Sequence, residues 1–228
     1  MKKNRKKNIL VIAPHADDEV LGCGGSLNKL STKYNIYILV MTDANSGIPE
    51  KYSKKFSNTI KKQALEAHKI LGVKKSIFFN FPVLGLQNVK NYLIADKIKH
   101  LVDEVKPEIV FLPSKHDLNS DHRYIFEASI IAIRNPKLYN INKILSYETP
   151  SESDWGNELI QSERLNYYIS INKKNLSKKI SAMKKFKSEY KLSPHPRSEE
   201  NLEALARLRG SYFFSEFAEA YTVVKIIE

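Results

Sequence analysis

Four titratable side chains are crowded into residues 15–19, in the stretch PHADDE, directly after the apolar run ILVIA at 9–13. An apolar run of this length predicts a buried strand, so the polar stretch begins where that strand ends. Burying several carboxylates without a cation is costly, because each loses its hydration. A divalent metal resolves the conflict: His15 and Asp18 can coordinate it, and Asp17 stays free to handle a proton.

A second polar loop offers the remaining ligand. Residues 108–112 predict another buried strand, which runs into the loop SKHDLNSDHR at 114–123. Loops that follow the strands of an open α/β sheet meet at the carboxyl ends, where ligands bind. One His and one Asp of the first loop, with one His of the second, make a three-ligand site with an open position, the pattern of catalytic zinc. The alternative is structural, with Asp17 and Asp18 as helix caps and His122 on an exposed helix face.

The sequence at this point resembles the PIG-L/LmbE family of zinc-dependent N-acetyl-sugar deacetylases. The resemblance covers nearly the whole chain. It is carried by three motifs: PHADDE at 14–19, GCGG at 22–25 and NSDHR at 119–123. Supporting matches are TD at 42–43, AHKILGV at 67–73, FP at 81–82, SYE at 146–148 with Trp155, PHPRS at 194–198, and residues 216–221.

This resemblance implies a set of roles. His15, Asp18 and His122 are then the metal ligands and Asp17 is the general base. The implied reaction removes acetate from an N-acetylated amino sugar, with zinc lowering the pKa of the attacking water. Ferrous iron is an alternative metal, because iron and zinc share such ligands.

One departure from the family concerns the proton for the departing amine. Asn119 stands where many members carry a histidine, and an amide can donate a hydrogen bond to an oxyanion but cannot deliver a proton. We expect His195, in a loop stiffened by two prolines, to act as the acid, with His116 as a weaker candidate. The alternative for His195 is an ordinary surface turn. Gln63 also stands where relatives often carry glutamate, which puts a substrate contact there in doubt.

Other polar and aromatic residues near these motifs have candidate roles. Asp121 is expected to orient an imidazole, to cap the helix that begins there, or both. Arg123 and Arg197 can grip a phosphate or carboxylate with two hydrogen bonds, although Arg123 is equally a helix-surface charge. Thr42 and Trp155 lie in loops expected to bind substrate, where Trp155 stacks on a sugar ring or simply packs.

Apolar runs and helical periodicity alternate along the chain in a pattern that predicts an α/β fold. We expect a single domain at 8–228, with a Rossmann-like, mostly parallel sheet flanked by helices, as in LmbE-like proteins. Strands are predicted at 8–13, 36–41, 76–80, 108–112, 143–147, 165–171 and 221–227. Helices are predicted at 22–33, 53–71, 88–105, 121–134, 173–190 and 198–209.

Size and charge narrow the classes further. The chain has 228 residues and a hydrophobic fraction of 42%, which fits one folded domain. Its net charge of +12 includes a basic tail at 1–7 that we expect to be disordered. Nucleic acid, an anionic membrane and a phosphorylated substrate each suit that charge, and so does biased composition. Aromatic residues do not interleave with the basic runs, so no nucleic acid is expected as a partner.

The cellular location of the protein can be predicted from the targeting and membrane-spanning segments that the sequence does not show. The apolar run 9–13 is too short for a signal-peptide core, and no run approaches the roughly 18 apolar residues that span a bilayer. Cys23 is the single cysteine and suits a reducing compartment. We therefore expect a cytoplasmic protein.

Two other functions compete with deacetylation. One is a sugar-binding protein that has lost turnover, although binding alone does not need a spare base beside the metal. The other is a different mononuclear metallohydrolase; phosphoesterases often use two metals, and ligands for only one are counted. The expected partner is a small N-acetylated sugar, free, phosphorylated or nucleotide-linked, and the sequence is compatible with a homo-oligomer.

Overall fold

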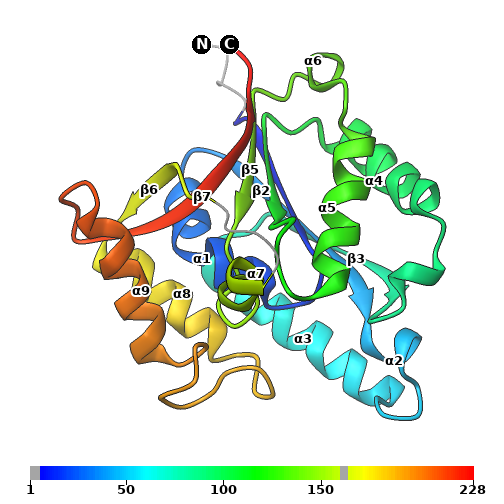
Figure 1. Cartoon of the computed structure of the whole chain (residues 1–228), viewed down its shortest axis with the longest axis horizontal. Coiled ribbons are helices and arrows are strands. Elements are labelled where there is room, and N and C mark those ends of the chain that lie inside the picture. Colours follow the sequence, from blue (N-terminus) through cyan, green and yellow to red (C-terminus); the bar gives the residue numbers. More distant parts are fainter. Residues whose placement is uncertain (1–5, 160–163) are drawn as a thin grey trace.

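The computed structural model describes residues 6–159 and 164–228, in which a seven-stranded sheet has the order β3-β2-β1-β4-β5-β7-β6. Helices cover both faces of this sheet (Figure 1). The strands are β1 (Asn8–Ala13), β2 (Asn35–Asp43), β3 (Lys75–Pro82), β4 (Ile109–Pro113), β5 (Lys143–Tyr147), β6 (Tyr167–Ile171) and β7 (Phe217–Ile226). The helices are α1 (Asp18–Leu30), α2 (Ala44–Gly47), α3 (Lys54–Leu71), α4 (Asn91–Val105), α5 (Ser120–Ala132), α6 (Pro136–Tyr139), α7 (Ser153–Leu159), α8 (Lys173–Met183) and α9 (Glu199–Ser211), with a 3-10 turn η1 (Leu86–Asn88).

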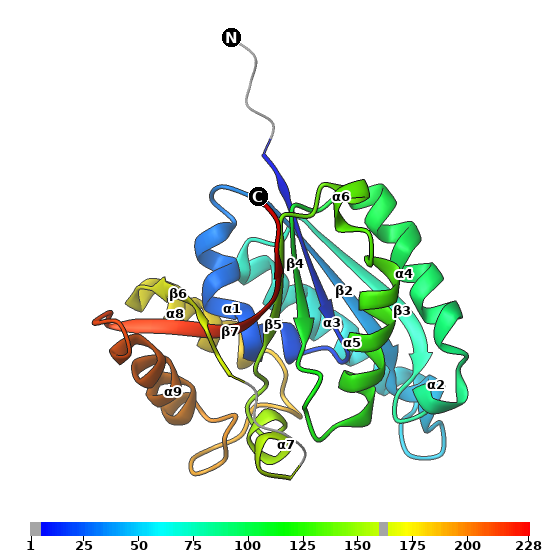
Figure 2. The ribbon, with the colours of Figure 1, turned by 45° about the horizontal axis from the view of Figure 1, so that its top comes forward.

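The central strand β1 is apolar on both faces, because successive side chains of a strand point to opposite sides. Leu10 and Ile12 pack in the core cluster that includes α4 and α5. Ile9 and Val11 pack in a second cluster with Cys23 of α1. Figure 2 shows α4 and α5 on one side of the sheet and α1 and α8 on the other. The continuous run ILVIA therefore reflects a strand with helices on both sides.

The strand order reverses direction at β1. This strand pairs in parallel with β2 on one side and with β4 on the other. A reversal of this kind opens a crevice beyond the carboxyl ends of the two neighbouring strands. The loops that follow β1 and β4 are the two polar loops identified from the sequence, so the fold brings them to one place.

The predicted fold class is confirmed, with one antiparallel exception. β7 runs antiparallel to both β5 and β6, while the pairs among β1–β5 are parallel. Several boundaries differ from the prediction. The helix predicted at 173–190 ends at Met183, and the last strand begins at Phe217 rather than at 221. The short helices α2, α6 and α7 were not predicted, since so few residues carry no clear periodicity.

The first helix begins earlier than predicted, at Asp18 rather than Gly22, so the GCGG stretch is helical. Glycine is a poor helix former, which is why the sequence pattern delays the expected start. Tertiary packing explains its presence: a Cβ at Gly22 would lie 2.3 Å from Cδ2 of Tyr147, and one at Gly25 would lie 2.6 Å from Cδ1 of Ile171. Glycine therefore lets α1 approach the sheet closely, beside the polar loop.

Two further expectations concern the N-terminus and membranes. Residues 1–5 of the predicted basic tail lie outside the described residues. Lys6 and Lys7, which are described, contact the fold: Lys6 Nζ donates to Ser31 O at 3.0 Å, and Lys7 Nζ lies 2.5 Å from Glu108 Oε2. In the described ranges, every helix is too short or too polar to cross a bilayer.

A buried ion pair joins α8 to β7 behind the first helix. Lys179 Nζ lies 2.6 Å from Glu219 Oε1, and both side chains are nearly inaccessible. The Glu219 carboxylate also accepts hydrogen bonds from the backbone N–H groups of Gly25 and Ser26, at 3.0 and 2.6 Å. Glu219 thus ties the last strand to the middle of α1, and Lys179 balances its charge.

Removing the cation of this pair should destabilise the fold strongly. Lys179→Met keeps the helix propensity and leaves a buried, unpaired carboxylate, which costs about 3–5 kcal/mol. Urea unfolding should show this loss, whereas Lys178→Met, at an exposed position of the same helix, should change stability by less than about 0.5 kcal/mol. Equal unfolding midpoints for the two variants would contradict the assigned role of the pair.

Candidate metal centre and active site

Three ligand atoms converge at the crevice between β1 and β4. His15 follows β1, Asp18 is the first residue of α1, and His122 lies in the first turn of α5. Asp18 Oδ2 is 3.2 Å from both His15 Nδ1 and His122 Nε2, and these two nitrogens are 3.4 Å apart. Ligand atoms at roughly 2.0–2.1 Å from a tetrahedral zinc ion lie about 3.3 Å from one another. The triangle therefore fits one divalent ion and leaves a coordination position open.

Each imidazole of this triad, which comprises His15, Asp18 and His122, is oriented by a second carboxylate. Asp121 Oδ2 lies 3.1 Å from His15 Nε2, and Asp117 Oδ2 lies 2.6 Å from His122 Nδ1. Such contacts set which ring nitrogen faces the centre and raise its basicity. Asp117 was not singled out from the sequence, although it lies in the polar loop after β4, five residues before His122.

Negative charge accumulates around the triad on carboxylates that are almost fully buried. Asp18, Asp117 and Asp121 are each at most 1% exposed, and Asp121 Oδ1 is buried without a hydrogen-bond partner in the part of the chain that is described. Burial disfavours a charge on Asp18, yet the neighbouring His122 holds the pKa of this carboxyl well below its ordinary value. These buried carboxylates need a cation to balance their negative charge.

The two imidazoles supply positive charge when no ion does. Burial by itself lowers the pKa of His15, but hydrogen bonds to Asp121 and Asp18 outweigh burial and raise that pKa to about 9. The pKa of His122 is likewise raised, against the effect of burial, by Asp18 and Asp117. A metal ion binds neutral imidazole, so its binding displaces these protons. The charge balance of the site therefore fits a divalent ion.

Asp17 lies beside the triad in a conformation that is unusual for a residue with a side chain. Its φ is 134°, which costs conformational energy unless the surroundings enforce it. Its backbone N–H donates to Glu19 Oε2 at 3.2 Å, and Glu19 Oε1 lies 2.9 Å from His68 Nε2. His68 Nδ1 in turn lies 2.7 Å from Ser76 Oγ. A buried polar chain from β3 through α3 thus helps to hold Asp17 in place.

The Asp17 side chain is paired with a residue from near the other end of the sequence. Arg197 Nη1 donates to Asp17 Oδ2 at 3.0 Å and to Glu189 Oε2 at 2.9 Å, and its Nε donates to Ser151 Oγ at 3.0 Å. Burial and the nearby Asp18 raise the pKa of Asp17 well above its ordinary value, and Arg197 opposes that shift. Arg197 was predicted to grip an anion of the substrate. Its guanidinium is instead occupied by these carboxylates, because a buried Asp17 requires a countercharge.

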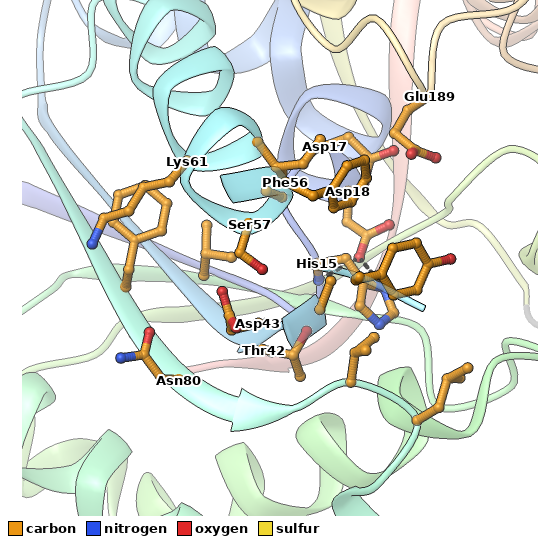
Figure 3. A pocket seen from close by; sticks show the side chains of 18 of the residues that line it. His15, Asp17, Asp18, Thr42, Asp43, Phe56, Ser57, Lys61, Asn80 and Glu189 are labelled. Atoms are coloured by element: carbon orange, nitrogen blue, oxygen red, sulfur yellow. Dashed lines mark hydrogen bonds and ion pairs between the residues drawn. The ribbon is translucent and has the colours of Figure 1, made fainter. Parts of the chain in front are cut away.

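A pocket of about 320 Å³ is lined at one end by His15 and Asp18 of the triad, together with Asp17. Figure 3 shows His15, Asp17 and Asp18 at one end of it, with Thr42 and Asp43 beside them. Asn119 also lines the pocket; its Oδ1 caps α5 by accepting from Asp121 N at 3.0 Å, and its Nδ2 is the donor that it can offer. Thr42 Oγ1 donates to Pro14 O at 2.8 Å, so this predicted substrate contact also fixes the loop after β1.

Three predicted site residues are not brought together with the triad. Trp155 is 56% exposed on α7 and does not line the pocket. Arg123 Nη1 donates to the carbonyl oxygens of Asp117 and Leu118, both at 2.6 Å. It therefore stabilises the polar loop after β4 and is not free to bind an anion through this nitrogen. His195 is outside the pocket lining as well; its Nδ1 accepts from Arg197 N at 3.1 Å.

His195 is also poorly suited electrostatically to donate a proton. Partial burial, and then the positive charges of Arg197 and Lys191, lower its pKa below the ordinary value. The ring is therefore mostly neutral near pH 7. The sequence indicates that this loop is constrained by prolines, but the direction of the side chain depends on which residues the loop packs against.

The chain is similar to known proteins over the region that contains the triad. The family model PIG-L, described as GlcNAc-PI de-N-acetylase, matches residues 10–133, which contain all three triad residues. An uncharacterized deacetylase, YaiS, of Escherichia coli (strain K12) is 33% identical over 196 residues, covering 81% of this chain and 93% of that protein.

Solved structures share the fold. N,N'-diacetylchitobiose deacetylase from Pyrococcus horikoshii superposes with a TM-score of 0.74 at 23% identity, covering 96% of this chain and 84% of that one. GalB, the 4-carboxy-2-hydroxymuconate hydratase from Pseudomonas putida KT2440, superposes with a TM-score of 0.72 at 19% identity, covering 97% and 98%. The same fold thus occurs with two different reactions, and the side chains of the site must decide between them.

The carboxylate behind His122 should control metal affinity. Asp117→Asn keeps the size of the side chain but removes its negative charge, and loss of such a partner typically weakens metal binding about 10–100-fold. Competition with a chelator should detect this change for Zn²⁺. Asp96→Asn, on the exposed face of α4, serves as the matched control and should leave affinity unchanged. Equal affinities in the two variants would refute this role of Asp117.

Proposed function

The chain belongs to the PIG-L family, and from this premise we propose that it is a metal-dependent hydrolase that removes the acetyl group from an N-acetylated amino sugar or a conjugate of one. The observation that carries the proposal is the juxtaposition of the triad with Asp17 at the end of one pocket. We propose zinc as the ion, because two imidazoles and one carboxylate form a common catalytic zinc site. Ferrous iron uses the same donors.

The residues of the triad would hold the ion, and Asp17 would act on the attacking water. A bound divalent ion supplies a lowered water pKa and a Lewis acid for the amide carbonyl. Asp17 accepts the proton of the water, and Arg197, at 3.0 Å, keeps its carboxylate turned toward the pocket. Asn119, which lines the pocket, would donate a hydrogen bond from Nδ2 to the carbonyl oxygen as negative charge develops there.

The departing amine also needs a proton. His195, the residue expected to supply it, lies outside the pocket lining and holds little positive charge at neutral pH. Asp17 lies in the pocket and gains a proton when the water attacks. We therefore propose that Asp17 returns that proton to the nitrogen. Replacing His195 by alanine should then leave the pH–rate profile of the enzyme unchanged.

Two alternative functions are less well supported. Phosphoesterases often bind two metals, whereas the described residues form one candidate ligand group. A binding protein without turnover would have no use for a buried carboxylate at a strained backbone position beside the metal. The free, buried Cys23 is compatible with the proposed cytoplasmic location.

The decisive experiment is acetate release from a panel of N-acetylated sugars, sugar phosphates and nucleotide sugars. We expect release by the zinc-loaded protein and its loss on treatment with a chelator, restored by added Zn²⁺. Asp17→Asn should keep Zn²⁺ bound and lower kcat by about 10²–10⁴-fold. A zinc-loaded wild-type protein that releases no acetate from any member of the panel, or an active Asp17→Asn variant, would overturn the proposal.

A further inference from the structure

The pocket extends well beyond the atoms that the proposed reaction needs. From the triad it follows the carboxyl ends of β2 and β3 toward the edge of the sheet, where β3 is the outermost strand. Figure 3 shows Lys61 and Asn80 at the end of the pocket away from His15 and Asp18, with α3 forming the wall above them. A substrate bound at the triad therefore has a second space beside it.

That second space, here called the α3–β3 compartment, is lined mainly by apolar side chains. Its walls are formed by Tyr52, Phe56, Ile60, Lys61 and Phe78. Phe56 and Ile60 are four residues apart and so share one face of α3. The four apolar members are all partly exposed, although Phe78 also packs against a core cluster. Their accessible surface gains free energy when an apolar ligand covers it.

Two polar oxygens beside the compartment are used by the protein itself. Asp43 Oδ1 accepts from Ser46 N at 2.9 Å, and Ser57 Oγ accepts from Asn45 N at 2.9 Å. Both interactions hold the chain between β2 and α3 in place. Lys61 Nζ and the exposed Asn80 side chain stay available at the end of the pocket away from the triad, so hydrogen bonding is offered at that end rather than along the apolar walls. The walls themselves favour an apolar group.

Lys61 adds a cation to one side of the compartment without changing this conclusion. Its Nζ lies over the Phe78 ring, 4.8 Å from the centroid, and among the described residues it has no carboxylate within salt-bridge distance. A lysine placed this way shields the ring with its alkyl stem and keeps its ammonium group near water. The compartment is therefore apolar inside, and its charged group is at the rim.

We propose that the α3–β3 compartment binds an aryl or alkyl group that the substrate carries next to the N-acetylated amino sugar. This inference rests on the proposed deacetylation, because it places the scissile amide at the triad. The apolar group can be attached as an aglycone or can extend the acyl chain itself. Both attachments present the same chemistry to Phe56, Ile60 and Phe78, and the experiment separates them.

The test compares kcat/KM of the zinc-loaded enzyme for four substrates: the methyl, hexyl and phenyl glycosides of N-acetylglucosamine, and the methyl glycoside of N-hexanoylglucosamine. We expect the hexyl and phenyl glycosides, or the hexanoyl substrate, to exceed the methyl glycoside of N-acetylglucosamine by at least about tenfold, since each buried methylene contributes roughly fourfold. A gain with the hexyl and phenyl glycosides indicates that the apolar group is the aglycone. A gain with the hexanoyl substrate indicates that it belongs to the acyl chain.

Ile60→Gln tests whether the gain arises in this compartment. Glutamine has good helix propensity and similar size, and we expect it to reduce the ratio of hexyl to methyl substrate to about twofold or less. Leu65→Gln is the matched control, because Leu65 is 47% exposed on the same helix and does not line the pocket. Its ratio should equal that of the wild type.

The outcomes separate this inference from the proposed function. Equal kcat/KM for all substrates, or a gain that persists in Ile60→Gln, would overturn the inference while leaving deacetylation intact. If no substrate is hydrolysed, the proposed function fails. Calorimetric binding of the phenyl glycoside to the zinc-loaded protein then tests whether the compartment binds an apolar group. Binding that weakens at least tenfold in Ile60→Gln would support the compartment; absent or unchanged binding would refute it.

Discussion

The site depends on positive charge at the centre of a cluster of buried carboxylates. Asp18, Asp117 and Asp121 are withdrawn from water, and the atoms of the triad leave room for one ion between them. The chain can concentrate negative charge here only because the crevice between β1 and β4 lets two loops meet. The packing of two parallel strands against β1 thus determines where the chemistry takes place.

The same principle of paired buried charges connects the two ends of the chain. Arg197 pairs with Asp17, and Glu219 with Lys179 is anchored to the amides of α1. The partners from the last third of the sequence lie beyond residues 10–133, the part that matches the family model. The C-terminal third therefore supplies the countercharge for Asp17, a buried acid of the first polar loop.

Fold and reaction are related only loosely in this architecture. Superposable structures include both a deacetylase and a hydratase, so the arrangement of strands does not select a reaction. The proposed deacetylation rests on family membership and on Asp17 beside a three-ligand site. Substrate choice would then depend on side chains of α3 and β3 that are distant from the triad along the chain. Chemistry and specificity in this proposal occupy opposite ends of one pocket.

The sequence by itself determined the α/β class, the positions of most strands and, through the family motifs, the group His15, Asp18 and His122. These are local properties: an apolar run marks each strand, and the polar residues follow it immediately. Only the tertiary structure decided that Asp117 supports His122, and that Arg197 pairs with Asp17. Asp17 and Arg197 are 180 positions apart, and no periodicity or spacing connects them. Their pairing follows from desolvation, which depends on what the folded chain places around a charge.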